Sequence, residues 1–438
     1  MTRICASLSS VSDIDRIDGA DMAEVRLDLL GPNVPSVSGK ELLVTYRNGI
    51  DLSLLPDGFN GMIDIGEEKR PDTKVTVVSS HHDHEKTPSA EEIVSKLNGL
   101  DGDIAKGAFT VNSFTDLHSI YTAASELKKK HVLLGMGGLG TVTRIRGPLL
   151  KNEFTFAYVG EPTAPGQLSL DEMVHLREDS IILGLLGHPI SKTLSPQMQN
   201  AALKAAGISG IYLKFDSENI DNLEDVIREY NIRGMNVTIP FKEKIISHLD
   251  KVDADAKVVG AVNTVVNDNG TLTGYNTDIL GIDKAMERAQ VDVKGMKAVL
   301  MGSGGGARGC AYALTRKGCS VSVVSRNGET ARQLAKDIGC ESMPQNSVSI
   351  LRYDMVVNCT PIGMYEFGYY PLSINQLTGR HVVFDMAYGK ETPLIAEANR
   401  VGALAIPGEE MLIGQGSASF KLWTGQDQYE TMRKAVLD

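Results

Sequence analysis

Cysteine is scarce in this chain of 438 residues, and none of its five cysteines belongs to a CxxC pair. An odd number of cysteines without that spacing argues against both a disulfide framework and a thiolate zinc site. Long apolar runs are missing too, because no stretch reaches the roughly 18 residues that a membrane-spanning helix needs. The first residues, MTRICASLSS, lack the basic region and apolar run of a signal peptide. We therefore expect a reduced, cytoplasmic protein without a membrane partner.

Basic residues are also outnumbered, because the chain has 44 Lys and Arg residues against 55 Asp and Glu residues, which gives a net charge of −11. A nucleic-acid-binding protein usually carries a basic excess, so no nucleic-acid partner is expected. The composition, 42% hydrophobic and 23% charged, is that of a globular protein. At about 150 residues per domain, the length predicts two or three domains. Glycine is abundant, with 44 residues, which indicates many tight turns or close approaches of the backbone to a ligand.

The first third of the chain alternates short apolar runs with polar, helix-like segments. Eight such runs predict a compact (β/α)8 barrel, a TIM barrel, over residues 1–178. This length is short for a fold that typically takes about 250 residues, so several helices must be single turns or missing. The predicted strands are Arg3–Ser7, Met22–Asp28, Leu42–Tyr46, Met62–Ile65, Lys74–Ser79, Ile104–Ala108, His131–Gly135 and Phe154–Ala157.

A second α/β pattern opens at Ile181 with the buried run IILGLLG. Residues 179–282 are predicted to form a small α/β substrate domain, onto which residues 409–438 pack back. From Lys297, a strand, a glycine-rich loop, a helix and the strand SVSVVSR form a βαβ unit of the kind that binds dinucleotides. Residues 283–408 are therefore predicted to be a Rossmann-like domain, and the fold class is α/β in all three units.

Charged side chains stand at the predicted C-terminal strand ends of the barrel, where functional groups of this fold gather. Alternation along the second strand places Glu24, Arg26 and Asp28 on one face, inside the barrel. They form either a structural ion network or a site for a charged ligand. Lys106 lies on the sixth strand among apolar or small neighbours. Such a position favours the neutral amine that can form a Schiff base, with an ion-paired or snorkelling lysine as the alternative.

The motifs EVRLDLL, VTYR, SSHHDHEKTP, DIAKGAF, GLGTVTRI and TAPGQ resemble, in this order, the type I 3-dehydroquinate dehydratases over nearly the whole first unit. The resemblance implies that Lys106 forms an imine with the substrate ketone. It implies that His82 is the general acid and base, chosen over His81 and His84 because it stands five residues before Thr87. Asp51 departs from the pattern, because a longer glutamate usually partners the histidine there. Implied substrate contacts are Ser7, Glu24, Arg26, Arg47, Arg144, Gln167 and Thr163, which replaces a usual serine.

A glycine-rich loop joins the first strand and helix of the third unit. Its glycines allow close approach of a pyrophosphate, whose charge the helix N-terminus favours. The next strand ends in Ser325 and Arg326. An acidic residue there would favour NAD, whereas Arg326 suits the 2′-phosphate of NADP(H), with a plain surface arginine as the alternative. The predicted cofactor contacts in the loop are Gly302, Ser303, Gly304, Gly305 and Gly306.

Residues 181–438 resemble the shikimate dehydrogenases through GHPISKTLSP, NVTIPFKEK, GAVNT, GYNTD, NCTPIGM, FDMAYG and EEMLIGQGSASF. The resemblance implies that Lys242 and Asp278 handle the proton on the substrate oxygen while NADPH delivers hydride. Lys192 replaces a usual histidine, and Thr330 stands where a second cationic phosphate contact is common. Implied substrate contacts are Thr193, Ser195, Thr238, Asn263, Tyr388 and Gln415, and Met386 and Gly408 are implied near the nicotinamide.

The two resemblances together imply a bifunctional shikimate-pathway enzyme that needs NADP(H) and no metal. It would dehydrate 3-dehydroquinate to 3-dehydroshikimate and reduce that product to shikimate, so its partners are small molecules. A quinate-sensing regulator that has lost catalytic groups is one alternative, which the presence of Lys106, His82, Lys242 and Asp278 disfavours. NAD-dependent oxidation of quinate or shikimate is the other.

Overall fold

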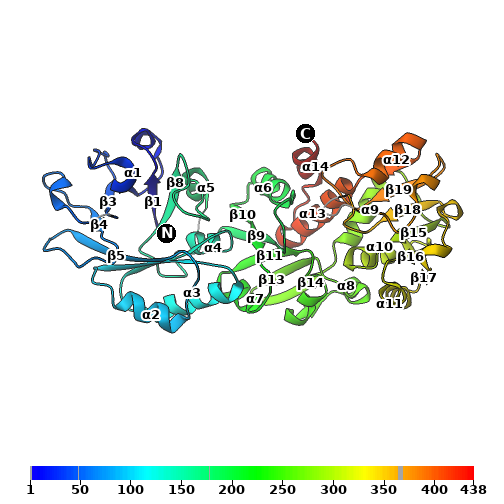
Figure 1. Cartoon of the computed structure of the whole chain (residues 1–438), viewed down its shortest axis with the longest axis horizontal. Helices are drawn as coiled ribbons and strands as arrows, with labels where there is room; N and C mark the ends of the chain where they lie inside the picture. Colours follow the sequence, from blue (N-terminus) through cyan, green and yellow to red (C-terminus); the bar gives the residue numbers. More distant parts are fainter. Residues whose placement is uncertain (1, 48, 177, 364–367) are drawn as a thin grey trace. The chain divides into compact units, whose positions relative to one another are not determined.

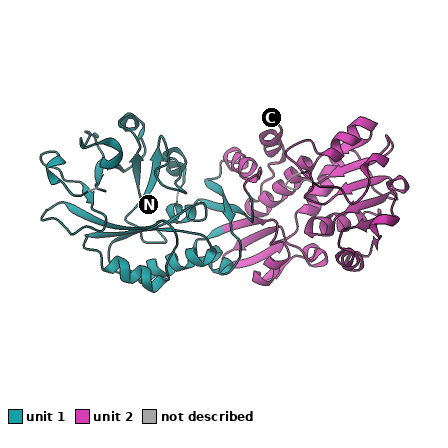
Figure 2. Ribbon diagram, in the orientation of Figure 1, with its two compact units in different colours: residues 1–190, 208–232 teal, residues 191–207, 233–438 magenta. Residues whose placement is uncertain are grey.

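The computed structural model describes residues 2–47, 49–176, 178–363 and 368–438. It divides into two compact units, one of residues 1–190 and 208–232 and the other of residues 191–207 and 233–438 (Figure 2). Over these described ranges, no helix combines the length and the apolar character that crossing a membrane requires.

Unit 1 contains the predicted barrel, as eight parallel strands in the order β7-β6-β5-β4-β3-β2-β1-β8 (Figure 1). Each of the eight predicted runs contains a strand. The second run is shorter than predicted, however, because its strand ends at Arg26, and Asp28, which was expected on that strand inside the barrel, lies in the short helix Leu27–Leu30 at the cavity. Next to β8, the Asn152 side chain accepts a hydrogen bond from the Leu133 amide at 2.8 Å and donates one to the Leu133 carbonyl at 3.0 Å, in place of a strand pair. The barrel is therefore nearly closed. Its strands are β1 (Arg3–Leu8), β2 (Met22–Arg26), β3 (Glu41–Thr45), β4 (Met62–Asp64), β5 (Thr76–Asp83), β6 (Ile104–Thr110), β7 (His131–Met136) and β8 (Phe154–Val159).

The connections between the strands are short, as the length of the chain requires. Three of the helices begin at a serine whose hydroxyl and backbone pair with an acidic side chain three residues on, a capping box that sets where the helix starts. The elements between the strands are η1 (Val11–Arg16), α1 (Leu27–Leu30), η2 (Leu52–Leu54), α2 (Ala90–Asn98), α3 (Phe114–Glu126), α4 (Thr141–Ile145) and, after β8, α5 (Leu170–His175).

Side-chain alternation divides the barrel interior into layers. An apolar cluster includes Cys5, Met22, Leu43, Met62, Val78 and Ile104, one from each of six strands. Two residues further along a strand, the side chain returns to the same face. Each of these six strands therefore presents a polar residue above its apolar one, and all six are buried: Ser7, Glu24, Thr45, Asp64, Ser80 and Lys106.

Unit 1 continues past the predicted barrel boundary at residue 178. It includes the parallel pair β9 (Ile181–Gly187) and β10 (Gly210–Asp216), and α7 (Leu223–Glu229). The buried Arg146 guanidinium joins these segments, because it donates to the carbonyls of Glu178, Ser180, Tyr230 and Asn231 at 2.9–3.1 Å. A buried guanidinium is tolerated when its donors are satisfied in this way.

Unit 2 contains the predicted Rossmann-like sheet, with six parallel strands in the order β17-β16-β15-β18-β19-β20. The order reverses between β15 and β18, which is where such sheets bind their ligands. The strands are β15 (Lys297–Met301), β16 (Ser320–Val324), β17 (Glu341–Ser342), β18 (Met355–Asn358), β19 (Val382–Asp385) and β20 (Leu404–Ile406). Its helices are α10 (Gly305–Thr315), α11 (Gly328–Ile338) and α12 (Pro393–Val401), with 3-10 turns η4 (Gln345–Ser347), η5 (Ile350–Arg352) and η6 (Ile374–Gln376).

The rest of unit 2 is a smaller α/β region. Here β13 pairs antiparallel with both β11 and β14, and β12 pairs with β14 in parallel. The last two helices, α13 (Gly408–Thr424) and α14 (Tyr429–Leu437), pack on α9 (Asp278–Arg288) and α6 (Ser195–Ala205) respectively. The remaining elements are β11 (Ile232–Val237), η3 (Lys244–His248), β12 (Lys251–Val252), α8 (Ala254–Val259), β13 (Thr264–Asp268) and β14 (Thr271–Tyr275).

Two candidate active sites

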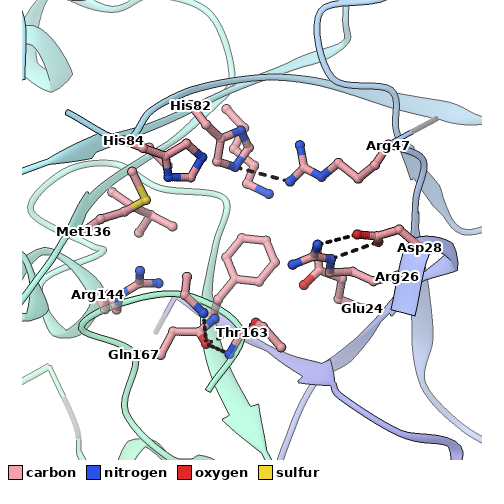
Figure 3. A pocket seen from close by; sticks show the side chains of 15 residues that line it. Glu24, Arg26, Asp28, Arg47, His82, His84, Met136, Arg144, Thr163 and Gln167 are labelled. Carbon is pink, nitrogen blue, oxygen red and sulfur yellow. Dashed lines mark hydrogen bonds and ion pairs between the residues drawn. The ribbon is translucent and has the colours of Figure 1, made fainter. Parts of the chain in front are cut away.

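A cavity of about 400 Å³ opens at the C-terminal strand ends of the barrel (Figure 3). The predicted site residues of the first unit meet there, except Ser7, which lies below the cavity and donates to a Glu24 carboxylate oxygen at 2.7 Å. Thr45 donates to the other oxygen of Glu24 at 2.9 Å, so this buried carboxylate has partners on both sides. The predicted residues that line the cavity are Glu24, Arg26, Arg47, His82, Lys106, Arg144, Thr163 and Gln167.

Lys106 is only 4% exposed, and its ammonium lies 3.0 Å from the Asp64 carboxylate and 4.5 Å from the centre of the Phe156 ring. Its neighbours on β6 are apolar or small, as predicted, but the partner from β4 is a buried acid. Burial raises the pKa of Asp64, yet the Lys106 ammonium, the Ser80 hydroxyl and the Arg47 guanidinium outweigh it and hold that pKa below its ordinary value. Lys106 therefore faces a carboxylate that remains charged.

Asp64 is a functional candidate that the sequence analysis missed. The signal was available, because Asp64 follows Met62 by two residues, as Lys106 follows Ile104. That spacing places both side chains in the polar layer of the barrel. Only the three-dimensional structure, however, shows that the Lys106 ammonium and the Asp64 carboxylate lie 3.0 Å apart.

We expect the substitution Asp64→Asn to weaken unit 1, because it leaves a buried ammonium without a charged partner. Breaking a buried pair in this way costs about 3–5 kcal/mol. Hydrogen exchange followed by mass spectrometry should show faster exchange in peptides from β4 and β6. The double variant Asp64→Asn/Lys106→Met should recover much of the protection, since both charges are then gone. Equal exchange in the single variant and the wild type would contradict a strong pair.

His82 lines the same wall of the cavity as Arg47, whose guanidinium donates to the His82 Nε2 atom at 3.4 Å. Burial, together with the positive charges of Lys106 and Arg47, lowers the pKa of His82 to about 3. The imidazole is therefore neutral near neutral pH and able to accept a proton. Asp51, the expected carboxylate partner, instead accepts hydrogen bonds from the Ser53 amide and hydroxyl and caps η2.

Arg144 is a buried cation that no carboxylate neutralises among the described residues. It is 3% exposed, its Nε atom has no hydrogen-bond partner in the described chain, and burial lowers its pKa to about 10. Nearby, the Gln167 carbonyl accepts from the Thr163 and Ala164 amides at 2.8 and 3.0 Å, which holds the Gln167 side chain at the cavity. A buried guanidinium with a spare donor is suited to an incoming carboxylate.

A second cavity, of about 590 Å³, lies in unit 2 at the switch point of the Rossmann-like sheet. Most of the predicted cofactor residues line it. Gly408 is not among the lining residues but packs against Ala387, which is one of them, because a Cβ atom on Gly408 would stand 2.5 Å from the Ala387 carbonyl oxygen. The predicted residues that line the cavity are Thr238, Lys242, Gly302, Ser303, Gly304, Gly305, Gly306, Ser325, Arg326, Met386 and Tyr388.

The glycine-rich loop fits a dinucleotide. Gly302 has a φ of +116°, and a Cβ atom there would approach the Cys359 carbonyl oxygen to 3.0 Å. Gly304 caps α10 with no side-chain hydrogen bond, and a Cβ atom on it would meet open space. The first turn of α10 contains no acidic residue. The amide groups of this turn can therefore receive a phosphate, which is what an NADP(H) pyrophosphate needs.

Lys242, which lines this cavity, forms a close charged pair with Asp278, with 2.5 Å between the ammonium and a carboxylate oxygen. The other Asp278 oxygen accepts from the Asn263 amide at 2.8 Å, and the same amide lies 3.4 Å from the Gln415 carbonyl. The structure thus joins four predicted residues in one network. Ser195 begins α6 and its amide donates to the Thr193 hydroxyl at 3.1 Å.

No group of three or more His, Cys, Asp or Glu side chains lies in a metal-binding arrangement within the described ranges. The cysteines of unit 2 include Cys359 at the cavity wall and Cys310 in the core of α10. Burial raises the pKa of Cys359 well above its ordinary value, so its thiol remains protonated.

Three family models match the chain in the order of its units. The type I 3-dehydroquinase model matches residues 60–180, the shikimate dehydrogenase substrate binding domain matches residues 185–265, and the shikimate 5′-dehydrogenase C-terminal domain matches residues 408–437. The shikimate dehydrogenase (NADP(+)) of Carboxydothermus hydrogenoformans is 37% identical over 276 residues, which are 60% of this chain and 99% of that protein.

Solved structures are similar to the same part of the chain. The shikimate 5-dehydrogenase of Thermus thermophilus in complex with NADP(H) and shikimate is 33% identical, with a TM-score of 0.54, over 58% of this chain and 98% of that one. The quinate dehydrogenase of Corynebacterium glutamicum in complex with NAD is 32% identical, with a TM-score of 0.56, over 59% of this chain and 99% of that one.

Proposed function

The chain belongs to the shikimate dehydrogenase family and carries a type I 3-dehydroquinase domain ahead of that region, and from this premise we propose which residues perform its two reactions. The enzyme is bifunctional: it dehydrates 3-dehydroquinate and reduces the product with NADPH. The observation that carries the assignment is the pairing of one lysine with one carboxylate at each cavity, Lys106 with Asp64 and Lys242 with Asp278.

In the barrel, Lys106 is the nucleophile. Its ammonium first gives a proton to the paired Asp64 carboxylate, 3.0 Å away. The neutral amine then adds to the substrate ketone and, with loss of water, forms an imine whose carbon–nitrogen bond withdraws electrons from the neighbouring carbon. His82, neutral near pH 7, takes the proton from that carbon and returns it to the leaving hydroxyl, which departs as water. Water then hydrolyses the remaining imine, which releases 3-dehydroshikimate and returns Lys106 to its starting form. Arg144 receives the substrate carboxylate, and Gln167 and Thr163 receive its hydroxyls. Glu24, Arg26 and Arg47 complete the polar wall, with Ser7 behind Glu24.

In unit 2, bound NADPH supplies the hydride. Its pyrophosphate would be held by the loop residues Gly302, Ser303, Gly304, Gly305 and Gly306, and its 2′-phosphate by Ser325 and Arg326, while Met386 and Gly408 would lie near its nicotinamide. Lys242 donates the proton that the substrate oxygen needs, while Asp278 keeps the ammonium in place. Asn263 and Gln415 extend the network to the substrate, together with Thr193, Ser195, Thr238 and Tyr388.

The test is a single-pot reaction of the full chain with 3-dehydroquinate, first alone and then with NADPH. We expect the enone absorbance of 3-dehydroshikimate to rise in the first reaction. In the second, NADPH should be consumed in step with shikimate, identified by mass spectrometry. No enone from the wild-type chain would remove the first activity, and no oxidation of NADPH by added 3-dehydroshikimate would remove the second.

Oxidation of quinate with NAD is the second candidate for unit 2, since the quinate dehydrogenase neighbour holds NAD. Arg326 at the cavity favours NADP(H), because an arginine can hold a 2′-phosphate in charge-assisted hydrogen bonds. We also propose that the protein is cytoplasmic and that its three domains have the predicted limits, which are 1–178, 179–282 with 409–438, and 283–408.

The substitution Arg326→Gln is expected to reduce the preference for NADPH over NADH by about 10- to 100-fold, the worth of one charge-assisted contact of about 1.5–3 kcal/mol. The loss should fall mainly on the KM for NADPH, because NADH has no phosphate for the arginine to hold. Steady-state rates with NADPH and with NADH measure this preference. Arg352→Gln, an exposed arginine of η5, is the matched control and should leave the ratio unchanged. An unchanged ratio in Arg326→Gln would assign the phosphate to other groups.

A further inference from the structure

Three hydroxyl groups form a continuous chain at the cavity of unit 2. Ser303 lies in the glycine-rich loop, Ser325 follows β16, and Thr330 lies in the first turn of α11. The Ser303 hydroxyl donates to the Ser325 hydroxyl at 2.9 Å, and the hydroxyl oxygens of Ser303 and Thr330 are 2.7 Å apart. Both serines line the cavity, whereas Thr330 is not one of the described residues that line it. Thr330 therefore contacts the cavity wall through Ser303.

The number of protons gives this chain a direction. A hydroxyl group has one proton to donate. Since the Ser303 proton goes to Ser325, the proton in the 2.7 Å contact comes from Thr330. Thr330 also lies 2.9 Å from the Asn327 carbonyl, but that carbonyl already accepts from the Ala331 amide at 3.3 Å. Ser325 ends the chain, and its own proton has no acceptor within the described ranges.

The proton of Ser325 is available at the place proposed for the 2′-phosphate of the cofactor. Arg326, the proposed cationic contact, follows Ser325 directly and lines the same cavity. Phosphate oxygens are strong acceptors, so a hydroxyl holds a phosphate only by donating to it. Ser303 occupies a lone pair of Ser325 and so leaves the Ser325 proton for the ligand. Each hydrogen bond in such a chain polarises the next, which strengthens the donation from Ser325.

We propose that Thr330 is a positioning residue for NADP(H), which acts through Ser303 and Ser325 to hold the Ser325 proton toward the 2′-phosphate. The inference rests on the phosphate site proposed above. Thr330 stands where a second cationic phosphate contact is common, and in this chain it contributes through a hydroxyl that does not touch the phosphate. NAD(H) has a neutral ribose hydroxyl at that place, which can itself donate, so it gains little from an oriented Ser325 proton.

The test compares two variants of the full chain. Thr330→Val keeps the shape of the side chain and removes the hydroxyl, whereas Thr330→Ser keeps the hydroxyl. Calorimetry without substrate measures the Kd of NADP+ and of NAD+. We expect Thr330→Val to weaken the binding of NADP+ about 2- to 10-fold, the contribution of one ordinary hydrogen bond, and to leave that of NAD+ within about 1.5-fold. Thr330→Ser should bind both as the wild type does. In steady-state reduction, the KM for NADPH should rise by the same factor in Thr330→Val while kcat stays unchanged.

A double variant tests whether Thr330 acts through Ser325. Ser325→Ala should weaken NADP+ binding more than Thr330→Val does, because it removes the group that donates to the phosphate. Ser325→Ala/Thr330→Val should bind NADP+ no more weakly than Ser325→Ala alone, since the chain then has no terminal proton to orient. Losses that add in the double variant would overturn the proposal.

The matched control is Thr431→Val. Thr431 is likewise the third residue of its helix, α14, and its hydroxyl donates at 2.8 Å to Gln428, the residue before that helix. Its loss should leave both Kd values unchanged. An unchanged Kd for NADP+ in Thr330→Val, an equal weakening of NADP+ and NAD+, or a Thr330→Ser variant that behaves like Thr330→Val would overturn the role of Thr330 alone. A wild-type chain that binds NAD+ as tightly as NADP+ would overturn the proposed phosphate site as well, so the two failures are distinguishable.

Discussion

Dehydration of 3-dehydroquinate is expected to stop when Lys106 is replaced by alanine, while reduction of 3-dehydroshikimate continues at the wild-type rate. Lys106 is the sole lysine among the described residues that line the barrel cavity, so no other lining amine can form the imine. The loss should be at least roughly 10³-fold, within the range attributed to single catalytic groups. The enone absorbance measures the first activity and NADPH oxidation with added 3-dehydroshikimate measures the second.

Borohydride added during turnover makes this result specific. In the wild type, the reduced adduct should be found by mass spectrometry on the peptide that contains Lys106, and it should be absent in Lys106→Ala. Lys96→Ala, which removes an exposed lysine paired with Glu67 on the outside of the barrel, should keep both the rate and the adduct. An adduct on another lysine, or dehydration above about one tenth of the wild-type rate in Lys106→Ala, would refute the role of Lys106.

The second large effect is expected at Lys242 and Asp278, where substitutions should impair reduction and spare dehydration. Lys242→Ala should lower the kcat for reduction by roughly 10²–10⁴-fold, the usual contribution of a proton-transfer group, and leave dehydration unchanged. Asp278→Asn should lower it less, because Lys242 remains but its ammonium loses the carboxylate 2.5 Å away. The double variant should be little worse than Lys242→Ala, because residues that act as one unit are not additive.

Steady-state kinetics of both activities in the same preparation check this expectation. The KM for NADPH should change by no more than about twofold, since the glycine-rich loop and Arg326 are untouched. Lys257→Ala, an exposed lysine on α8, serves as the control and should behave as the wild type. Additive losses in the double variant would mean that Lys242 and Asp278 work independently, which their short contact argues against.

The elements were largely predictable from local patterns. Short apolar runs with period-two alternation predicted the barrel strands, because a strand buried in a barrel must present apolar residues at its base. The glycine-rich loop was predictable for a similar reason. Gly302 has a left-handed backbone that favours glycine, and a side chain at Gly304 would occupy the open space that a bound phosphate needs. These features depend on residues that are close together in the chain, so the sequence alone is enough to predict them.

The partners of the site residues were less predictable. Asp51 stands at the position expected for the partner of His82, yet its carboxylate bonds to Ser53, two residues away. A local cap forms at little entropic cost, whereas a bond to His82 would require a longer loop to be ordered around it. Asp64, 42 residues from Lys106 in the chain, supplies the buried carboxylate of the cavity instead.

Arg144 and Arg146 show where sequence reasoning ends. They lie two residues apart at the end of one short helix, and composition and spacing do not separate them, so that only the resemblance to the dehydratases singled out Arg144. The sequence by itself determined the barrel, the Rossmann-like unit, the loop for the cofactor and the two lysines. Only the tertiary structure decided that Arg144 faces the cavity with a spare donor, that Arg146 binds four backbone carbonyls, and that Asp64 pairs with Lys106. The physical reason is that a charge acquires its role from the groups that surround it once it is buried, and those groups come from strands and loops far away in the chain.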